Sequence, residues 1–409
     1  MNKLVEKPLG DVRVLELSVW EAGPTCGTLL ALLGAEVIKI EKPEGDPGRI
    51  AFMGDYELEN NYPYCHYFAN MNLNKRHVTL NLKTSEGKDL FKKLIQKSDV
   101  FIHNLTVKAA EDLDVTYDNV SKINPNIIYV SITGYGEESP YKYYPCYDTI
   151  AQAMGGIIYI TGHPETPPAR CGASIGDSAA ALSAVIGILA ALHQRKATGR
   201  GSKIEISMVD SIVGLLRAIS TLYFGSHEIV ERMGCAVRGI TPHNVYKCKD
   251  GWVVIICYDP QQRLKCIELV CKEMGKNFEE YKPETLVAAK VKKEYIEKVD
   301  SLVNSWTSTK LKSEVFHKLS QNGIPCGIVY NIEELIRDQH VQSRKLFTNL
   351  KNEEGKEYTI ITSHIKMSTC KVNPCLPPSK PGYHNEEVFS KILGLSKEEI
   401  EKLKSKKII

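Results

Sequence analysis

The segment VRVLELSVWEAGPTCGTLLALLGAEVIKIE, residues 12–41, decides the fold of this chain. Its first six residues alternate and then become apolar, as in a strand that enters a buried sheet, and Gly23-Pro24 interrupts that strand. Residues 25–33 carry apolar side chains at helical spacing, and residues 36–41 predict a second strand. A strand, a helix and a strand joined by short glycine-marked turns predict a βαβ unit with parallel strands and a right-handed crossover.

The same alternation of strands and helices continues along the first half of the chain. Strands are predicted at residues 78–82, 99–102 and 127–132, with one helical face at residues 90–95. This pattern favours a doubly wound, Rossmann-like α/β domain with a parallel sheet. The segment AGPTCG, residues 22–27, does not fit the GxGxxG fingerprint, which disfavours a nicotinamide-binding site.

The length of 409 residues exceeds what one apolar core usually holds, so more than one domain is expected. The pattern changes near residue 225, where a hairpin with an Asp250-Gly251 turn is followed by three helical segments. We therefore expect residues 1–224 to form the large Rossmann-like domain and residues 225–326 a smaller α+β domain. Residues 327–409 are expected to return to the large domain.

Composition excludes several classes of protein. Lys plus Arg number 52 and Asp plus Glu number 49, so the net charge of +3 predicts neither a nucleic-acid nor a membrane surface. The most apolar run, residues 179–192, is shorter than the roughly 20 residues that span a bilayer, and the opening residues lack a signal-peptide pattern. The 12 cysteines are scattered, without a CxxC pair. We expect a cytoplasmic protein with reduced thiols and no metal site.

The segment GASIGDS, residues 172–178, places Asp177 at the start of the apolar run. One interpretation is structural, with the Asp177 carboxylate as the N-cap that accepts backbone N–H groups of the first helical turn. The other is catalytic, since the same N–H groups and the helix dipole stabilise an anion that can act as a nucleophile. Flanking glycines let a substrate approach the backbone closely. From the residues alone both interpretations stay open.

A series of motifs in a fixed order resembles the family III CoA-transferases, the group of formyl-CoA transferase and the carnitine CoA-transferases. The resemblance extends over nearly the whole chain and comprises PLGDVRVLEL (8–17), AGP (22–24), GAEVIKIEKPEGDPGR (34–49), NKR (74–76), LNLKT (80–84), SITGYG (131–136), YDTIAQAMGG (147–156), IGDS (175–178), TGRGSKIEISM (198–208) and GIPCGIV (323–329). The resemblance implies a Rossmann-like large domain and a smaller central domain in an intertwined homodimer whose active site takes residues from both chains.

The resemblance also implies a reaction. The Asp177 carboxylate, which matches the aspartate of the family's GD motif, would attack an acyl-CoA and form a mixed anhydride. The released CoA thiolate would then give an enzyme-bound CoA thioester, and the incoming acid would repeat the steps in reverse. The substrates would be an acyl-CoA and a small carboxylic acid, with no permanently bound cofactor.

The resemblance carries over a CoA-binding site position by position. Glu21 replaces the family's common Gln and is expected beside Asp177, where each carboxylate raises the pKa of the other. Lys42 falls where the family often has Arg, and Lys108 is the cation that remains near a position where Asp112 replaces Arg. Lys75, Arg76 and Arg49 are further candidates for phosphate contacts. The complete expected CoA-binding set is Glu21, Ala22, Lys42, Leu80, Asn81, Leu82, Lys83, Asn104, Leu105, Thr106, Lys108, Tyr147 and Asp148.

Two other functions are compatible with the same fold. An α-methylacyl-CoA racemase resembles this chain and keeps the Asp177 position, but pairs it with a His where this chain has Tyr147. A tyrosine phenol, with a pKa of about 10, is a poor base near neutral pH, which disfavours racemisation. A CoA-binding regulator without turnover is disfavoured by the intact GDS segment.

The sequence does not specify which acids are exchanged. Frequent Lys, Ile and Asn fit an AT-rich genome, and such genomes include anaerobic fermenters. This makes an exchange between an enoyl- or aryl-acyl-CoA and a 2-hydroxy acid one hypothesis, beside carnitine-like, oxalate and succinate donors.

Overall fold

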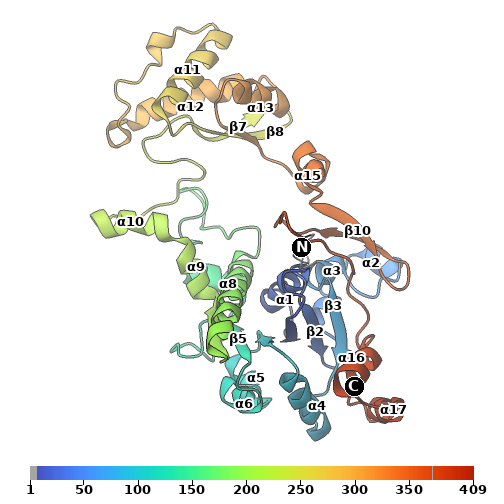
Figure 1. Cartoon of the computed structure of the whole chain (residues 1–409). Coiled ribbons are helices and arrows are strands. Elements are labelled where there is room, and N and C mark those ends of the chain that lie inside the picture. The colour runs from blue at the N-terminus through green and yellow to red at the C-terminus, as the bar shows by residue number, and fades with distance from the viewer. Residues whose placement is uncertain (1–6, 371) are drawn as a thin grey trace. The chain divides into compact units, whose positions relative to one another are not determined.

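The computed structural model describes residues 7–370 and 372–409 and divides the chain into two compact units (Figure 1). Unit 1 comprises Met1–Ile157, Cys171–Ala218 and Gln339–Ile409, and unit 2 comprises Ile158–Arg170 and Ile219–Asp338. From the sequence we expected domain boundaries after residues 224 and 326. The structure adds to the second unit a short segment, Ile158–Arg170, that the sequence analysis did not predict.

Unit 1 is built on a parallel sheet, as predicted, and this sheet has six strands. The strands are β1 (Arg13–Leu17), β2 (Glu36–Glu41), β3 (Lys75–Thr79), β4 (Val100–His103), β5 (Ile128–Thr133) and β6 (Ser202–Ser207), in the order β3-β2-β1-β4-β5-β6. This is the strand order of a doubly wound Rossmann-type sheet, and the direction of winding changes between β1 and β4. Ligands of such sheets bind outside the carboxyl ends of the strands at that point.

Apolar side chains alternate between the two faces of the sheet and give each face its own core. Val14 belongs to one core and its neighbour Leu15 to the other, because successive strand residues point to opposite faces. On the Val14 face pack α1 (Ala22–Leu32) and α8 (Ile175–Thr198). On the Leu15 face pack α4 (Ser85–Gln96), α6 (Tyr117–Ile123), α16 (Asn385–Leu393) and α17 (Lys397–Ser405), so the C-terminal helices complete a three-layer unit (Figure 1).

The helix after the GDS segment is longer than its apolar run. α8 has 24 residues and, by length and composition alone, is long enough and apolar enough to cross a membrane. Half of its most apolar window is buried inside the structure, and its inner side contributes to the Val14-face core. It ends at Gly199, which takes the left-handed conformation with a φ of 66° that favours glycine after a helix. These features are typical of a core helix.

Two edge strands differ from the prediction. The strand expected at residues 78–82 lies at Lys75–Thr79, paired with β2 from Val37↔Lys75 to Glu41↔Thr79. Its first half carries charged side chains, so a search for an apolar run missed it. β6 was not predicted as a strand, because Lys203 and Glu205 alternate with isoleucines at the sheet edge.

Unit 2 contains an antiparallel sheet of β7 (His243–Cys248), β8 (Gly251–Ile256) and β9 (Cys326–Ile328) with the helices α11 (Pro260–Met274), α12 (Lys293–Thr307) and α13 (Lys312–Gln321). The hairpin and the three helices agree with the sequence. The expectation that residues from 327 onward return to the large domain is wrong at its start. β9 pairs with β8 inside unit 2, and the chain rejoins unit 1 at Gln339.

The remaining elements are short. They are η1 (Pro47–Arg49), α2 (Asp55–Glu59), α3 (His66–Met71), α5 (Val107–Asp112), α7 (Asp148–Met154), α9 (Met208–Leu215), α10 (Arg217–Ser226), η2 (Phe278–Glu280), η3 (Ala288–Lys290), α14 (Ile332–Arg337), α15 (Gln339–Arg344), β10 (Phe347–Lys351) and β11 (Glu357–Ile361). The hairpin of β10 and β11 packs on α3, where Tyr358 stacks on Tyr64 with ring centres 4.7 Å apart.

Candidate active site

The turn from β1 into α1 lies at the winding change of the sheet. α1 begins at Ala22, three residues before the predicted start, and Pro24 lies in its first turn, where a missing N–H costs nothing. Trp20 takes a left-handed φ of 64°, which bends the chain sharply after β1. The first N–H groups of α1, which have no partner within the helix, are therefore available to a group outside it.

Asp177 uses one of these N–H groups. It lies in the first turn of α8, and the N-cap is Ser174, so the interpretation of Asp177 as the N-cap is wrong. Its carboxylate accepts a hydrogen bond from the Ala22 backbone N–H at the start of α1. The helix end is instead satisfied by Asp148, whose Oδ1 accepts from the Gly176 N–H at 2.8 Å. Because Asp148 accepts the N–H at the start of α8, the half-buried Asp177 carboxylate stays available to a ligand.

Two neighbouring carboxylates, those of Glu21 and Asp148, shape the electrostatics around Asp177. Burial, Glu21 and Asp148 together raise the pKa of Asp177 to about 7, and the Ala22 N–H partly opposes that rise. Burial also raises the pKa of Glu21, against a hydrogen bond from the Ser174 side chain, and Asp148 adds to the rise. The expected effect of Glu21 on Asp177 is therefore present, whereas the rise in the pKa of Glu21 is due to burial and to Asp148. Near neutral pH Asp177 exchanges between carboxylic acid and carboxylate.

A cavity of about 1100 Å³, called here the Asp177 cavity, opens in front of this carboxylate within unit 1. Its wall includes the ends of β1, β4 and β5 and the starts of α1 and α8. It brings together eight of the residues predicted from the sequence: Glu21, Ala22, Asn104, Leu105, Thr106, Tyr147, Asp148 and Asp177. Asn104 also fixes the turn after β1, since its Oδ1 accepts from the Val19 N–H at 2.9 Å and its Nδ2 donates to the Val19 carbonyl at 2.7 Å.

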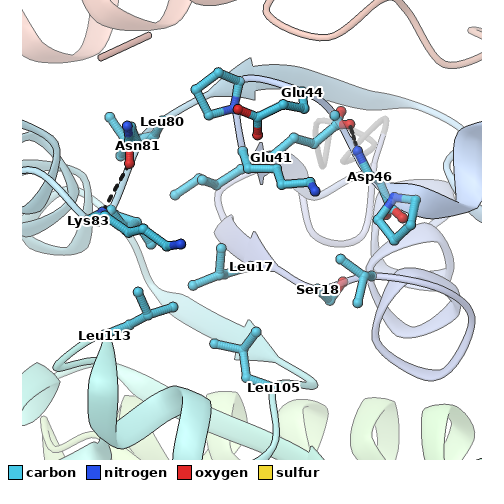
Figure 2. A pocket seen from close by; sticks show the side chains of 17 residues that line it. Leu17, Ser18, Glu41, Glu44, Asp46, Leu80, Asn81, Lys83, Leu105 and Leu113 are labelled. Carbon is cyan, nitrogen blue, oxygen red and sulfur yellow. Dashed lines mark hydrogen bonds between the residues drawn. The ribbon is translucent and has the colours of Figure 1, made fainter. Parts of the chain in front are cut away.

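A second cavity of about 400 Å³, called here the strand-end cavity, lies at the carboxyl ends of β1, β2 and β3 (Figure 2). It shares Val19 and Leu105 with the Asp177 cavity. Asn81 Oδ1 accepts from the Lys83 backbone N–H at 3.1 Å, which shapes the turn that follows β3. The strand-end cavity collects the other predicted residues Lys42, Leu80, Asn81, Leu82 and Lys83, and Leu105.

The structure does not bring the remaining predicted cations to either cavity. Lys108 pairs with Asp112 at 2.5 Å on the exposed side of α5 and lines neither cavity. Arg76 pairs with Glu36 and Glu387. Lys75 and Arg49 are buried against carboxylates. The charged groups of these four residues are engaged elsewhere in unit 1, so the structure does not support them as phosphate contacts.

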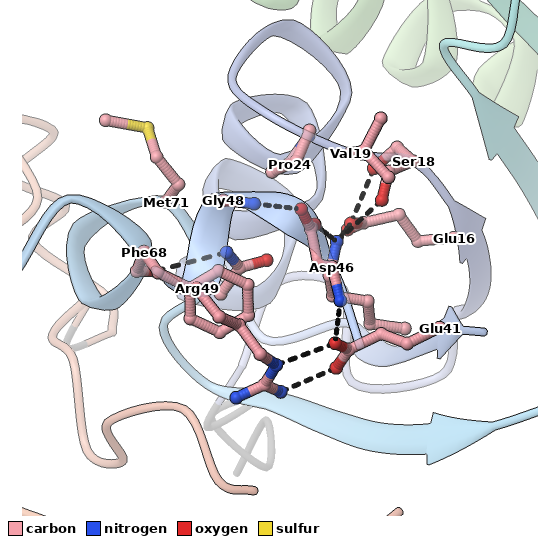
Figure 3. A network of polar contacts seen from close by, with 12 residues as sticks. Glu16, Ser18, Val19, Pro24, Glu41, Asp46, Gly48, Arg49, Phe68 and Met71 are labelled. Atoms are coloured by element: carbon pink, nitrogen blue, oxygen red, sulfur yellow. Dashed lines mark hydrogen bonds and ion pairs between the residues drawn. The ribbon is translucent and has the colours of Figure 1, made fainter. Parts of the chain in front are cut away.

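A buried network of charged residues, which sequence reasoning missed, underlies the turn after β1 (Figure 3). Lys39 Nζ donates to the Ser18 carbonyl at 2.7 Å and pairs with Asp46 at 2.9 Å and Glu16 at 3.3 Å. Lys75 Nζ donates to the Pro24 carbonyl at 2.8 Å. The two ammonium groups therefore hold both ends of the segment that carries Glu21 and Ala22.

The other half of this network fixes the wall of the strand-end cavity. Arg49 binds Glu41 through two hydrogen bonds of 2.7 and 2.6 Å, and His77 Nδ1 lies 2.8 Å from the same carboxylate. Burial alone would raise the pKa of Glu41, but these partners outweigh burial and hold the pKa well below its usual range. A signal was present in the sequence, since charged residues in strands that are covered on both faces must be paired.

Comparison with known proteins gives a consistent result. Residues 9–385 match the profile of CoA-transferase family III. The chain is 35% identical to the formyl-CoA:oxalate CoA-transferase of Streptomyces coelicolor, over 99% of this chain and 100% of that protein. It is 31% identical to the succinyl-CoA–D-citramalate CoA-transferase of Chloroflexus aurantiacus, over 98% of each. A CaiB/BaiF family protein from Brucella suis has a TM-score of 0.82 at 27% identity, with 95% of this chain and 100% of that chain covered. The chain belongs to CoA-transferase family III.

Proposed function

We propose that this enzyme moves CoA reversibly from an acyl-CoA to a free carboxylic acid, with Asp177 as the nucleophile. One observation carries the proposal: a half-buried carboxylate faces a large cavity at the winding change of the sheet, and the N–H that supports it comes from a neighbouring helix. A carboxylate with a purely structural role would accept hydrogen bonds from the backbone N–H groups of the helix that carries it. Here Asp148 fills that role instead.

In the first half-reaction an Asp177 oxygen attacks the thioester carbonyl carbon of the donor. The C–S bond breaks, so a mixed anhydride forms and CoA leaves as the thiolate. The thiolate sulfur then attacks the Asp177 carbonyl carbon, which releases the donor acid as a carboxylate and leaves CoA bound to Asp177 as a thioester. The Ala22 N–H lies where negative charge develops on the Asp177 carbonyl oxygen, which is the role of an oxyanion donor.

In the second half-reaction the acceptor carboxylate attacks the Asp177 thioester and displaces the thiolate. The thiolate then attacks the acceptor carbonyl of the new anhydride, so the acceptor leaves as its CoA ester and the Asp177 carboxylate is restored. No net proton is consumed. The energy of the thioester is kept in a covalent bond throughout, so the exchange needs no other energy source.

The strand-end cavity is the proposed site for the nucleotide end of CoA. Lys42 is exposed at its rim and offers a cation to a phosphate, while Asn81 and Lys83 lie on the same wall. Val19 and Leu105 connect this cavity to the Asp177 cavity, so the pantetheine arm would pass them on its way to the nucleophile. The exposed ring of Tyr147 is the proposed surface for that arm.

A homodimer is the proposed assembly, and cytoplasm the proposed location. Leu182, Ile186 and Leu189 form an apolar row on α8 and are 46%, 69% and 39% exposed within the single chain. A continuous apolar row on a long helix favours coverage by a second copy of the chain. Gel filtration with activity measured across the peak tests this, and activity that follows a monomer fraction would contradict it.

The function is tested by mapping the nucleophile. The enzyme is mixed with a panel of acyl-CoAs without an acceptor, quenched with hydroxylamine, and digested. We expect a mass change on the Asp177 peptide that is absent in Asp177→Ala and retained in the matched surface variant Asp89→Ala. Absence of any adduct, together with deuterium at the acyl α-carbon in heavy water, would instead support the racemase alternative.

A further inference from the structure

The start of α1 lies directly on the end of β1. Gly23 and Gly27, one helical turn apart, share one face of α1. A Cβ atom at position 23 would overlap Ser18 Cβ, and a Cβ atom at position 27 would overlap Glu16 Oε2. Glycine at these two positions therefore lets the helix backbone rest on a buried carboxylate. Such a carboxylate is tolerated only with a cationic partner.

Lys75 of β3 is a cationic partner of Glu16 and contacts α1 at the same place. Its Nζ lies 2.9 Å from Glu16 Oε2 and donates to the Pro24 carbonyl at 2.8 Å. It also donates to the Met71 carbonyl and to Asn72 Oδ1, each at 3.0 Å. One ammonium group therefore connects the end of β1, the first turn of α1 and the end of α3.

Two parts of the Asp177 cavity wall depend on these contacts. Ala22, two residues before Pro24, supplies the N–H that the Asp177 carboxylate accepts, and Met71 is part of the wall itself. The side chain of Lys75 is 0% exposed within unit 1 and lines neither cavity. Because Lys75 is covered by its own chain, neither a substrate nor a second copy of the chain contacts its ammonium. An effect of Lys75 on the reaction must therefore pass through α1 or α3.

We propose that Lys75 is a positioning residue for the transfer, which holds the start of α1 so that the Ala22 N–H stays at the Asp177 oxygen on which negative charge develops. This inference rests on the proposed CoA transfer at Asp177. An oxyanion donor is effective because it is fixed before the reaction begins, and a donor that has to move loses part of that effect. Lys75 fixes this donor through the backbone, without a contact of its own to the reacting atoms.

The test measures acylation of Asp177 in Lys75→Met, which removes the ammonium and keeps an apolar side chain. The enzyme is mixed with the acyl-CoA that labels Asp177, without an acceptor, and quenched with hydroxylamine at successive times between pH 5 and 9. We expect acylation to slow at least ~10-fold, with the half-saturating acyl-CoA concentration changed less than ~2-fold. Because the Ala22 N–H lowers the pKa of Asp177, its displacement should also raise the midpoint of the pH profile by about 0.5 pH unit.

Two further variants separate positioning from stability. Leu94→Ala in the Leu15-face core lowers stability away from α1, and below its melting temperature it should keep the rate and the midpoint of the unmodified enzyme. The double variant Lys75→Met/Glu16→Gln removes the unpaired carboxylate, so it should regain stability but not the acylation rate.

The inference would be overturned by a normal acylation rate in folded Lys75→Met or in the double variant. A slower rate with an unchanged midpoint would also overturn it, since that result is expected of a purely structural residue. None of these results would affect the proposed function, which fails only if no acyl-CoA of the panel labels Asp177 in the unmodified enzyme.

Discussion

Two groups of charged residues, one buried and one half-buried, lie at the same edge of the sheet, and they differ in charge balance. In the network below the turn after β1, the carboxylates of Glu16, Glu41 and Asp46 are paired with Lys39, Lys75 and Arg49. Around the nucleophile, Glu21, Asp148 and Asp177 lie together without a paired cation among the described residues.

The difference in charge pairing distinguishes carboxylates that hold the backbone from carboxylates that can react. Paired charges keep the pKa of Glu41 low, so this carboxylate stays ionised and holds the backbone in place. Burial, together with the unpaired carboxylates of Glu21 and Asp148, raises the pKa of Asp177 to about 7, and such a shift is typical of a group that reacts. The network therefore stabilises the turn that carries Glu21 and Ala22. This turn positions the Ala22 N–H at the Asp177 carboxylate.

The largest expected effect comes from the nucleophile itself. Asp177→Asn should lower kcat by about 10⁴-fold or more, since a covalent route is lost with its attacking oxygen. The folded-state pKa of Asp177 lies above its unfolded value, so the folded state binds the extra proton and stability falls as pH rises toward about 7. Asp177→Asn should therefore raise the melting temperature at pH 8 and change it little near pH 4. An active Asp177→Asn enzyme would contradict the account.

The second effect concerns the balanced group. Lys39→Met leaves Glu16 and Asp46 without their shared ammonium and should lower the free energy of unfolding by about 3–5 kcal/mol. Urea unfolding measures the loss, with Lys92→Met on the exposed side of α4 as the control, where we expect less than about 0.5 kcal/mol. A Lys39→Met protein as stable as its control would show that the network is not needed to hold the turn.

The third prediction compares Lys42 and Lys108, which the sequence analysis assigned to the same CoA-binding site. Lys42→Ala at the rim of the strand-end cavity should raise KM for acyl-CoA about 5-fold, because an exposed phosphate contact is worth about 1 kcal/mol. Lys108→Ala should leave KM unchanged, since its ammonium pairs with Asp112 away from both cavities. The reverse order of effects would place the phosphates on α5.

The smallest expected effect is a shift in pH dependence. Acylation needs the Asp177 carboxylate, so kcat/KM should rise with pH through a midpoint near 7. Glu21→Gln removes a negative neighbour and should lower that midpoint by about 0.5–1 pH unit. Stopped-flow acylation between pH 5 and 9 measures it, and an unchanged midpoint would show that Glu21 does not act on Asp177.

The sequence predicted the parts of the fold that depend on apolar periodicity. Residues 12–41 gave the βαβ unit because their apolar spacing reflects burial directly. The start of β3 was missed because Lys75 and His77 are buried as members of ion pairs. Buried charged residues do not contribute to the apolar pattern from which strands are predicted. The start of α1 was placed too late because proline was taken to interrupt the chain, although the first helical turn tolerates it.

The candidate site was predicted through motif order more than through geometry. Eight predicted residues meet in the Asp177 cavity, but spacing could not show that Asp148 caps α8 in place of Asp177. Asp148 takes this role through a hydrogen bond from the Gly176 N–H, and the two residues are 28 positions apart in the sequence. Lys108 is a different case, since the sequence predicted a ligand contact for a cation near a strand end, and the structure shows its ammonium paired with Asp112 one helical turn away.

The central claim is that the Asp177 carboxylate becomes covalently bonded during transfer. It is tested most directly by a single turnover with an acceptor acid that carries ¹⁸O in both carboxyl oxygens. Attack on the Asp177 thioester and return of the thiolate to the acceptor leave one acceptor oxygen on Asp177, so its peptide should gain about 2 Da. If transfer occurs and the Asp177 peptide keeps its mass, the aspartyl anhydride route is contradicted.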